Sequence, residues 1–185
     1  MNILFKRVSN LWVPTTLFTG LAILFTYISL ANQARNILPV IALILTGLVS
    51  WTLVEYILHR FIFHWTQVKE PWKGLASGLH MAHHRTPDQD DIILAPPFVG
   101  LVFSVILYFV FAAVTWSWTA AALLEAGMFM GYVAYEWVHF GAHRFKMKRG
   151  IGKYLQQYHL RHHFKNPKGF FGVTSPLWDY VFRSL

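Results

Sequence analysis

Residues Ile92 to His143 form the longest apolar segment of the sequence: IILAPPFVGLVFSVILYFVFAAVTWSWTAAALLEAGMFMGYVAYEWVHFGAH. These 52 residues are almost continuously apolar. As one helix they would extend about 78 Å, whereas a bilayer core is about 30 Å thick, so the segment must fold back. The expected turn is Trp116-Ser117-Trp118-Thr119, because tryptophan favours the membrane interface and hydroxyl groups tolerate a bend. We expect transmembrane helices over residues 98–115 and 118–137.

Two more uncharged runs precede this stretch. Leu11–Leu30 has 20 residues and Ile37–Val54 has 18, which predicts transmembrane helices at about 11–30 and 37–58. The 185 residues are 55% hydrophobic and 13% charged, with no cysteine, which excludes an ordinary soluble domain and a disulfide-stapled one. The predicted fold is a single all-α membrane domain, residues 1–185, with four transmembrane helices and a cytoplasmic, histidine-rich helical cap formed by residues 59–95 and 138–185.

The basic residues predict the orientation. With four crossings, 15 of the 16 Lys and Arg residues fall on the side of both termini, and Arg35 alone falls on the other. By the positive-inside rule, both termini and the histidines should lie in the cytoplasm. We expect an integral membrane protein of a bacterial inner membrane. The rule also accounts for the net charge of +8, so nucleic acid is not an expected partner.

Ten histidines all fall on that predicted cytoplasmic side. They form four groups with the spacings HxxxxH, HxxHH, HxxxH and HxxHH. The histidines are His59, His64, His80, His83, His84, His139, His143, His159, His162 and His163. On a helix, steps of three and four residues return to the same face, so each HxxHH group presents three imidazoles that could serve more than one metal. His59 and His64 are five residues apart and need a helix end between them, or they serve different metals.

A multi-metal site is the interpretation we favour. Unliganded imidazoles at this density would be costly to pack and would repel one another once protonated, whereas neutral imidazole binds transition metals well. Ten such groups suit two metal ions. Glu55 and Glu136 lie one turn from histidines and are candidates to orient imidazoles, or alternatively to pair with Arg60 and Arg144. The role of Glu125, deeper in its helix, is left open.

The ordered boxes resemble a known family. Together with the flanks EYILHRFIFH (55–64), GFFG (169–172) and LWDYVF (177–182), they resemble the fatty acid hydroxylase and sterol desaturase superfamily, and are most similar to fatty acid 2-hydroxylases. The resemblance covers Glu55 to Phe182. It implies that all ten histidines are ligands of a dimetal centre of two Fe ions, which uses O2 and electrons to hydroxylate a lipid acyl chain at C2. Zinc is expected only as a substitute in preparations, because it cannot cycle electrons.

The electron donor should be a separate protein. Eukaryotic fatty acid 2-hydroxylases carry a fused cytochrome b5 domain, whereas Met1–Asn10 alone precede the first helix here, and no GxGxxG nucleotide motif occurs. We therefore expect a ferredoxin or cytochrome b5 as partner, and a membrane lipid or fatty acid as substrate. Arg60, Arg85 or Lys165 are candidates to meet its carboxylate or headgroup.

Other functions compete with this one. A sterol desaturase or a carotenoid hydroxylase of the same superfamily would share the metal boxes. A membrane metal transporter or metal-binding protein is a different class, but a transporter should place its ligands near the bilayer midplane. A haem cytochrome uses histidine pairs and would leave most of the ten unexplained.

Overall fold

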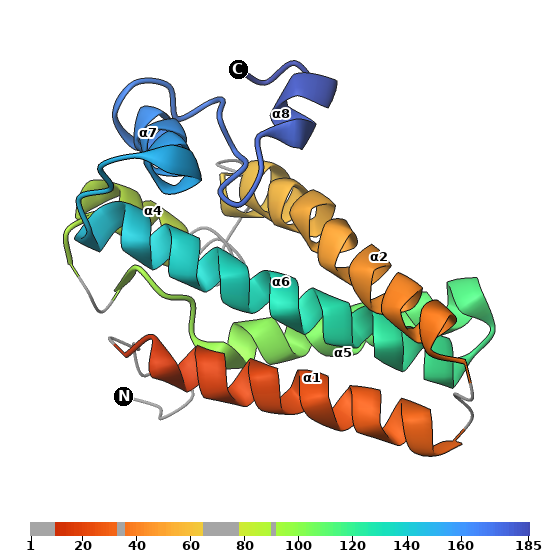
Figure 1. The fold of residues 1–185 in the computed structure, drawn as a ribbon. Coiled ribbons are helices and arrows are strands. Elements are labelled where there is room, and N and C mark those ends of the chain that lie inside the picture. Colours follow the sequence, from red (N-terminus) through yellow and green to blue (C-terminus); the bar gives the residue numbers. More distant parts are fainter. Residues whose placement is uncertain (1–9, 33–35, 65–77, 90–91) are drawn as a thin grey trace. The chain divides into compact units, whose positions relative to one another are not determined.

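The computed structural model describes residues 10–32, 36–64, 78–89 and 92–185. Within these ranges the regular elements are helices and no strand occurs, which confirms the all-α prediction. The helices are α1 (Trp12–Asn32), α2 (Ile37–Ile57), the π-helix η2 (Leu58–Phe63), α4 (Gly78–Arg85), α5 (Pro97–Thr115), α6 (Trp118–Arg144), α7 (Gly150–Phe164) and α8 (Leu177–Val181) (Figure 1). Residues 65–77 and 90–91 of the predicted cytoplasmic cap lie outside the described ranges, as do residues 1–9 and 33–35.

The chain divides into two compact units, each held together by its own contacts. The first contains α1, α5, α2 as far as Trp51 and α6 as far as Ala134, and the second consists mainly of Thr52–Ala95 and Tyr135–Leu185. Helices α2 and α6 therefore contribute to both units. All ten histidines belong to the second unit.

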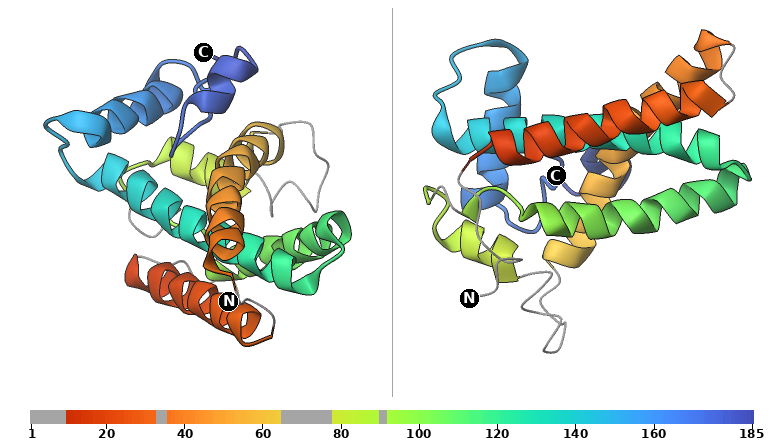
Figure 2. Two further views of the ribbon diagram at one scale, coloured as in Figure 1. Left: turned by 45° about the vertical axis from the view of Figure 1, so that its right-hand side comes forward. Right: turned by 90° about the horizontal axis from the view of Figure 1, so that it is seen from below.

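Aromatic side chains join the helices of the first unit, in which α1, α5 and the first part of α6 run alongside one another (Figures 1 and 2). Phe18 of α1 is buried, and its ring centroid lies 4.6 Å from that of Tyr132 and 5.6 Å from that of Phe129, both on α6. Phe25 of α1 contacts Tyr108 of α5 at 5.8 Å. Edge-to-face contacts of this kind add to the energy of area burial.

Two glycines bring α2 and α6 into backbone contact within the first unit. A Cβ atom at Gly47 would lie 2.0 Å from the carbonyl oxygen of Leu124, and one at Gly127 would lie 2.0 Å from the carbonyl oxygen of Ile44. Any side chain would clash at either position. Small residues at such crossings are typical of helices that pack within a membrane.

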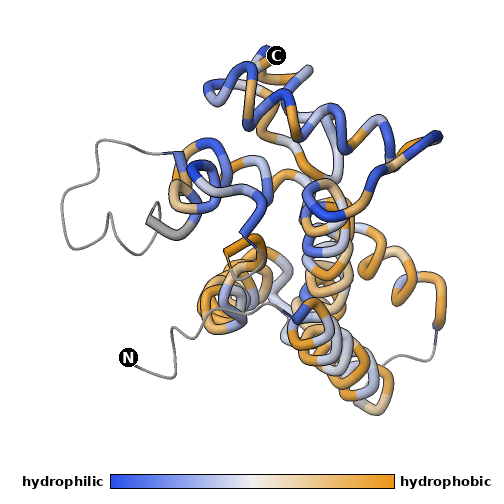
Figure 3. The backbone as a smooth tube through the Cα atoms, turned by 90° about the vertical axis from the view of Figure 1, so that its left-hand side faces the viewer, coloured by the Kyte–Doolittle hydropathy of each residue, from blue (hydrophilic) through white to orange (hydrophobic). Residues whose placement is uncertain are grey.

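Three of the described helices are long and apolar enough to cross a membrane: Trp12–Ala31, Ile37–Phe63 and Pro97–Thr115. Few of their residues are buried inside the protein, so their apolar side chains are available to lipid, and these helices are coloured mainly hydrophobic in Figure 3. Helix α6 is also long, but it carries Glu125 and Glu136. The fourth predicted crossing stays a prediction.

The turn between α5 and α6 lies where the sequence predicts it. Helix α5 ends at Thr115, and Trp116 adopts a left-handed conformation with φ 52°. The hydroxyl oxygen of Ser117 accepts a hydrogen bond from the Ala120 amide at 3.2 Å, which caps the start of α6. Helix α6 continues to Arg144, seven residues past the predicted end of the fourth crossing, so that His139 and His143 lie on one continuous helix.

In the second unit, side-chain hydrogen bonds tie α7 and α8 to the ends of the long helices. The Gln156 amide of α7 donates to the carbonyls of Ala142 at 2.8 Å and Phe145 at 2.6 Å. The Trp178 indole of α8 donates to the Thr52 hydroxyl at 2.9 Å. These contacts position α7 and the loop before α8 around the histidines.

Candidate metal centre

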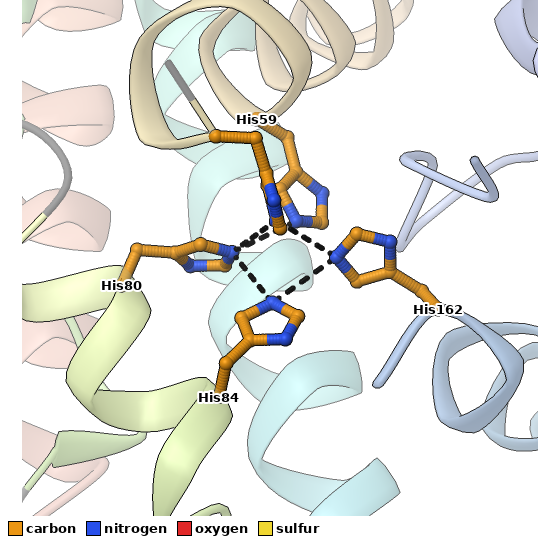
Figure 4. Close-up of side chains that lie close together, drawn as sticks. His59, His80, His84 and His162 are labelled. Carbon is orange, nitrogen blue, oxygen red and sulfur yellow. Dashed lines mark hydrogen bonds between the residues drawn. The ribbon is translucent and has the colours of Figure 1, made fainter. Parts of the chain in front are cut away.

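Five histidines of the second unit direct one ring nitrogen each to a common point, which we name site A. Its members are His59, His64, His80, His84 and His162, and their ligand atoms all lie within 4.8 Å of one another. The Nε2 atom of His80 lies 3.0 Å from the Nε2 atoms of His59, His64 and His84. Figure 4 shows His59, His80, His84 and His162 with their rings converging from different segments of the chain.

The other five histidines form a second cluster of the same kind, which we name site B. Its members are His83, His139, His143, His159 and His163. The Nε2 atom of His83 lies 3.0 Å from that of His139 and 3.1 Å from that of His143, which in turn lies 2.9 Å from that of His159. His83, His139 and His159 are buried. The structure thus brings all ten predicted residues together, as two sets of five.

The two HxxHH boxes divide their ligands in opposite ways. In α4, His80 and His84 contribute to site A and His83 to site B. In α7 the i and i+4 histidines contribute to site B, and the i+3 residue, His162, contributes to site A. Site A is completed by His59 of η2 and His64 just after it, and site B by His139 and His143 of α6. The sites adjoin, since the rings of His84 and His163 stack with their centroids 4.1 Å apart.

The π-helix explains how His59 and His64 serve one site. A π-helix closes i to i+5 hydrogen bonds, and the His64 amide donates to the His59 carbonyl at 3.2 Å. Residues five apart therefore lie on the same side of the turn, with ring centroids 5.1 Å apart. The structure places both histidines in site A, and that they bind the same metal ion stays a prediction.

Hydrogen bonding alone does not account for the spacing in site A. A neutral imidazole Nε2 carries either one proton or one lone pair, so it forms one good hydrogen bond in the ring plane. His80 nonetheless has three Nε2 neighbours at 3.0 Å. A cation at the centre accepts every lone pair at once, and ligands about 2.1 Å from an ion at right angles lie about 3.0 Å apart. The residues present therefore fit a metal ion.

The environment keeps these rings in the neutral form that binds metals. Burial, together with repulsion from His162 and His64, lowers the pKa of His84 to about 2. Burial and repulsion from His143 likewise lower the pKa of His83 to about 3. Uncharged imidazole is the form that offers a lone pair to a metal.

Backbone carbonyls of the loop 169–174 orient two histidines of site A. The Nδ1 atom of His162 lies 2.7 Å from the Gly169 carbonyl oxygen, and Nδ1 of His59 lies 2.5 Å from that of Phe171. A carbonyl only accepts, so each Nδ1 carries the proton and each Nε2 presents its lone pair to site A. Between these carbonyls, Phe170 adopts a left-handed conformation with φ 58°.

Phe171 and Asp179, which lie next to site A, were not among the site residues predicted from the sequence. The buried ring of Phe171 lies over site A, with its centroid 5.6 Å from those of His59 and His64 and 5.5 Å from that of His162. Asp179 is fully buried below the same loop. A signal for Asp179 was available, because it is the one acidic residue between Arg144 and Leu185.

The two predicted orienting carboxylates are both buried. Glu55 reaches the histidines through the loop, since it accepts hydrogen bonds from the Val173 and Thr174 amides and the Thr174 hydroxyl. Glu136 is fully buried in α6, and its role in orienting an imidazole stays a prediction.

Comparison with known proteins places the chain in a family. Residues 44–184 match the fatty acid hydroxylase family. A dihydroceramide fatty acyl 2-hydroxylase of Arabidopsis thaliana is 34% identical over 180 residues, which are 96% of this chain and 72% of the relative. A ceramide very long chain fatty acid hydroxylase of Saccharomyces cerevisiae is 35% identical over 176 residues, 92% of this chain and 43% of that protein.

A solved structure agrees with these relatives. Full-length Scs7p, of which only the hydroxylase domain is visible, superimposes with a TM-score of 0.85 at 32% identity, covering 98% of this chain and 67% of that one. The chain belongs to the fatty acid hydroxylase family. The resemblance predicted from the ordered histidine boxes is confirmed.

Proposed function

We propose that this protein hydroxylates the acyl chain of a membrane lipid at C2, at a dimetal centre held by all ten histidines. The observation that carries the proposal is the pair of adjoining five-histidine sites in a chain of the fatty acid hydroxylase family. The relatives from Arabidopsis thaliana and mouse are 2-hydroxylases by name. One domain, residues 1–185, would carry the activity.

The proposed metals are two Fe ions. Imidazole suits both Fe and Zn, but inserting oxygen into an unactivated C–H bond needs a metal that changes oxidation state. When bound, the iron pair supplies the activation of O2. Overall, one oxygen atom enters the C–H bond and the other becomes water, with two electrons from a donor and two protons.

The protein's own residues hold and enclose this centre. The histidines bind through neutral nitrogens, and the carbonyls of Gly169 and Phe171 keep two of them oriented. The Phe171 ring shields site A from water, which strengthens the electrostatic interactions inside it.

The location of the histidines favours oxidation near the carboxyl end of the chain. His59 lies in the last turn of the candidate span Ile37–Phe63 and His64 directly follows it, and His139 and His143 lie at the end of α6. With four crossings, these helix ends meet the headgroup level, where the polar end of an acyl chain also lies. Exposing the methyl end to water there would cost about 0.8 kcal/mol per CH2. In this topology, termini and sites face the cytoplasm.

A separate, acidic electron carrier such as a ferredoxin or cytochrome b5 is the proposed donor. Exposed cations cluster in the second unit, among them Arg149, Lys153, Arg161, Lys165 and Lys168. A positive surface attracts a negatively charged carrier and speeds encounter.

The test is tandem mass spectrometry of fatty acids released from cells that express the intact protein. We expect 2-hydroxy acids from the parent and from Gln157→Ala, an exposed position on α7, and none from His163→Ala on the same helix. Hydroxyl groups at mid-chain or terminal carbons, or products confined to sterols or carotenoids, would reject C2 chemistry. Transport of metal across vesicles without lipid oxidation would favour the competing class.

A further inference from the structure

We propose that Glu55 and Asp179 are positioning residues that tune the metal affinity of site A and leave site B unaffected. The inference rests on the proposed metal centre and deepens it. Both carboxylates are buried and neither belongs to the histidine clusters. Their point of action is the loop 169–174, whose carbonyls orient His59 and His162.

Asp179 fixes the first half of the loop through both of its oxygens. Its Oδ1 atom accepts hydrogen bonds from the Phe171 amide at 3.0 Å and the Ser184 hydroxyl at 2.7 Å. Its Oδ2 atom accepts one from the Gly172 amide at 2.7 Å. Hydrogen bonds to an ionised carboxylate are about twice as strong as neutral ones. The Phe171–Gly172 peptide is thereby held through its N–H group, the Gly172 amide, while its carbonyl accepts from His59.

Glu55 fixes the second half of the loop from α2. It accepts from the amides of Val173 and Thr174, the latter at 3.0 Å, and from the Thr174 hydroxyl. Glu55 of α2 lies four residues before His59, which belongs to η2, the direct continuation of α2. The residue that holds the loop and the ligand that the loop orients are therefore fixed to one rigid backbone.

The loop needs this support because its own conformation is strained and crowded. Phe170 has φ 58°, a left-handed conformation that is unfavourable for a residue with a side chain. A Cβ atom at Gly172 would lie 2.0 Å from the Ser175 carbonyl oxygen. With weaker carboxylate contacts the loop relaxes, and the two carbonyls lose their alignment with His59 and His162.

The effect is specific to one site because of which histidines the loop contacts. Among the described residues, the backbone acceptors for histidine Nδ1 atoms are Gly169 and Phe171, and both serve site A. Loss of such an outer partner lowers metal affinity by about 10–100-fold. The predicted change is therefore a weaker site A beside an unchanged site B.

The experiment measures metal affinity, not activity, in the purified full-length protein reconstituted in lipid nanodiscs. Metal-depleted protein is titrated with Co²⁺, whose visible absorption reports coordination, against a competing chelator. One background isolates site A by His159→Ala and His163→Ala, and the other isolates site B by His80→Ala and His84→Ala. Asp179→Asn is introduced into both, because an amide puts N–H groups where the loop requires acceptors.

We expect Asp179→Asn to weaken Co²⁺ binding 10–100-fold where site A is isolated, and by less than twofold where site B is isolated. Glu55→Gln should do the same. Glu125→Gln, a buried carboxylate of the first unit, is the control and should change neither affinity. If Asp179→Asn fails to fold, Ser184→Ala removes one donor to Asp179 and should give a smaller change of the same kind.

The outcomes separate this inference from the proposed function. No Co²⁺ binding by the parent protein would overturn the dimetal centre itself. Two bound ions in the parent, with equal weakening of both sites or of neither in the Asp179→Asn variants, would overturn the positioning role and leave the dimetal centre standing.

Discussion

Neighbouring histidines in one box should contribute to different metal sites, and a matched pair of double variants tests this division. In α4, His80→Ala with His84→Ala removes two ligands of site A. His83→Ala with His84→Ala removes one ligand from each site. Both variants lose two imidazoles from the same helix, so composition, charge and helix length are matched.

The expected difference follows from the division of ligands. The His80/His84 variant leaves site B with its five histidines, so one equivalent of metal should be held as tightly as in the parent. The His83/His84 variant leaves four histidines in each site, so neither equivalent should keep the parent affinity. Loss of an outer partner alone weakens metal binding about 10–100-fold, and each lost ligand should cost at least that, or about 1.4–2.7 kcal/mol.

Competition with a chelator of graded strength, followed by elemental analysis, counts the tightly held equivalents. We expect two for the parent, one for His80/His84 and none for His83/His84. The corresponding pairs in α7, His159/His163 and His162/His163, should repeat the pattern with the sites exchanged. Equal counts for the matched doubles would refute the division of each box between two sites.

Three further results are expected. Gly47→Ala or Gly127→Ala should lower the thermal unfolding temperature in detergent, because the new Cβ starts 2.0 Å from a carbonyl oxygen and such overpacking costs about 1–3 kcal/mol, whereas Gly20→Ala, with nothing within 4 Å, should not. Removal of metal from the parent by a chelator should lower the same temperature, because metal bound to the folded state stabilises it by about 2.7 kcal/mol when the free metal is at 100 times its Kd. An unchanged melting curve after verified metal removal would argue against any structural role of the metal. Turnover with a purified acidic donor at limiting concentration should fall as salt rises, and salt-independent turnover would remove the electrostatic part of the donor proposal.

The helices could be predicted because their signals are local. An uncharged run has the length of a bilayer core, and the turn at Trp116 and Ser117 combines interface residues with a capping hydroxyl. Histidines at i, i+3 and i+4 share a helix face wherever the helix packs. The predicted crossing ends at Trp137 because the bilayer thickness sets its length, whereas α6 itself continues to Arg144 and carries His139 and His143.

The division of the histidines could not be predicted, because the two HxxHH boxes have the same spacing and opposite assignments. His162 joins site A only because of what faces α7 in the folded chain. The π-helix after Ile57 could not be predicted either, because no residue type in Leu58–Phe63 indicates one. It brings the rings of His59 and His64 together. Tertiary packing decides both features.

The buried carboxylates Glu55 and Asp179 show what a list of metal-binding motifs leaves out. Asp179 accepts a hydrogen bond from the amide of Phe171, which lies eight residues earlier in the sequence. The carbonyl of Phe171 in turn accepts one from His59, which is 112 residues away in the sequence. Glu55, four residues before His59, accepts a hydrogen bond from the Thr174 amide of the same loop. GFFG contains no histidine, yet its Gly169 and Phe171 carbonyls accept from Nδ1 of His162 and His59, so that the Nε2 atoms face site A, and LWDYVF contributes Asp179, which holds that loop. For the same reason, substitutions in these motifs should alter metal affinity before they alter the fold.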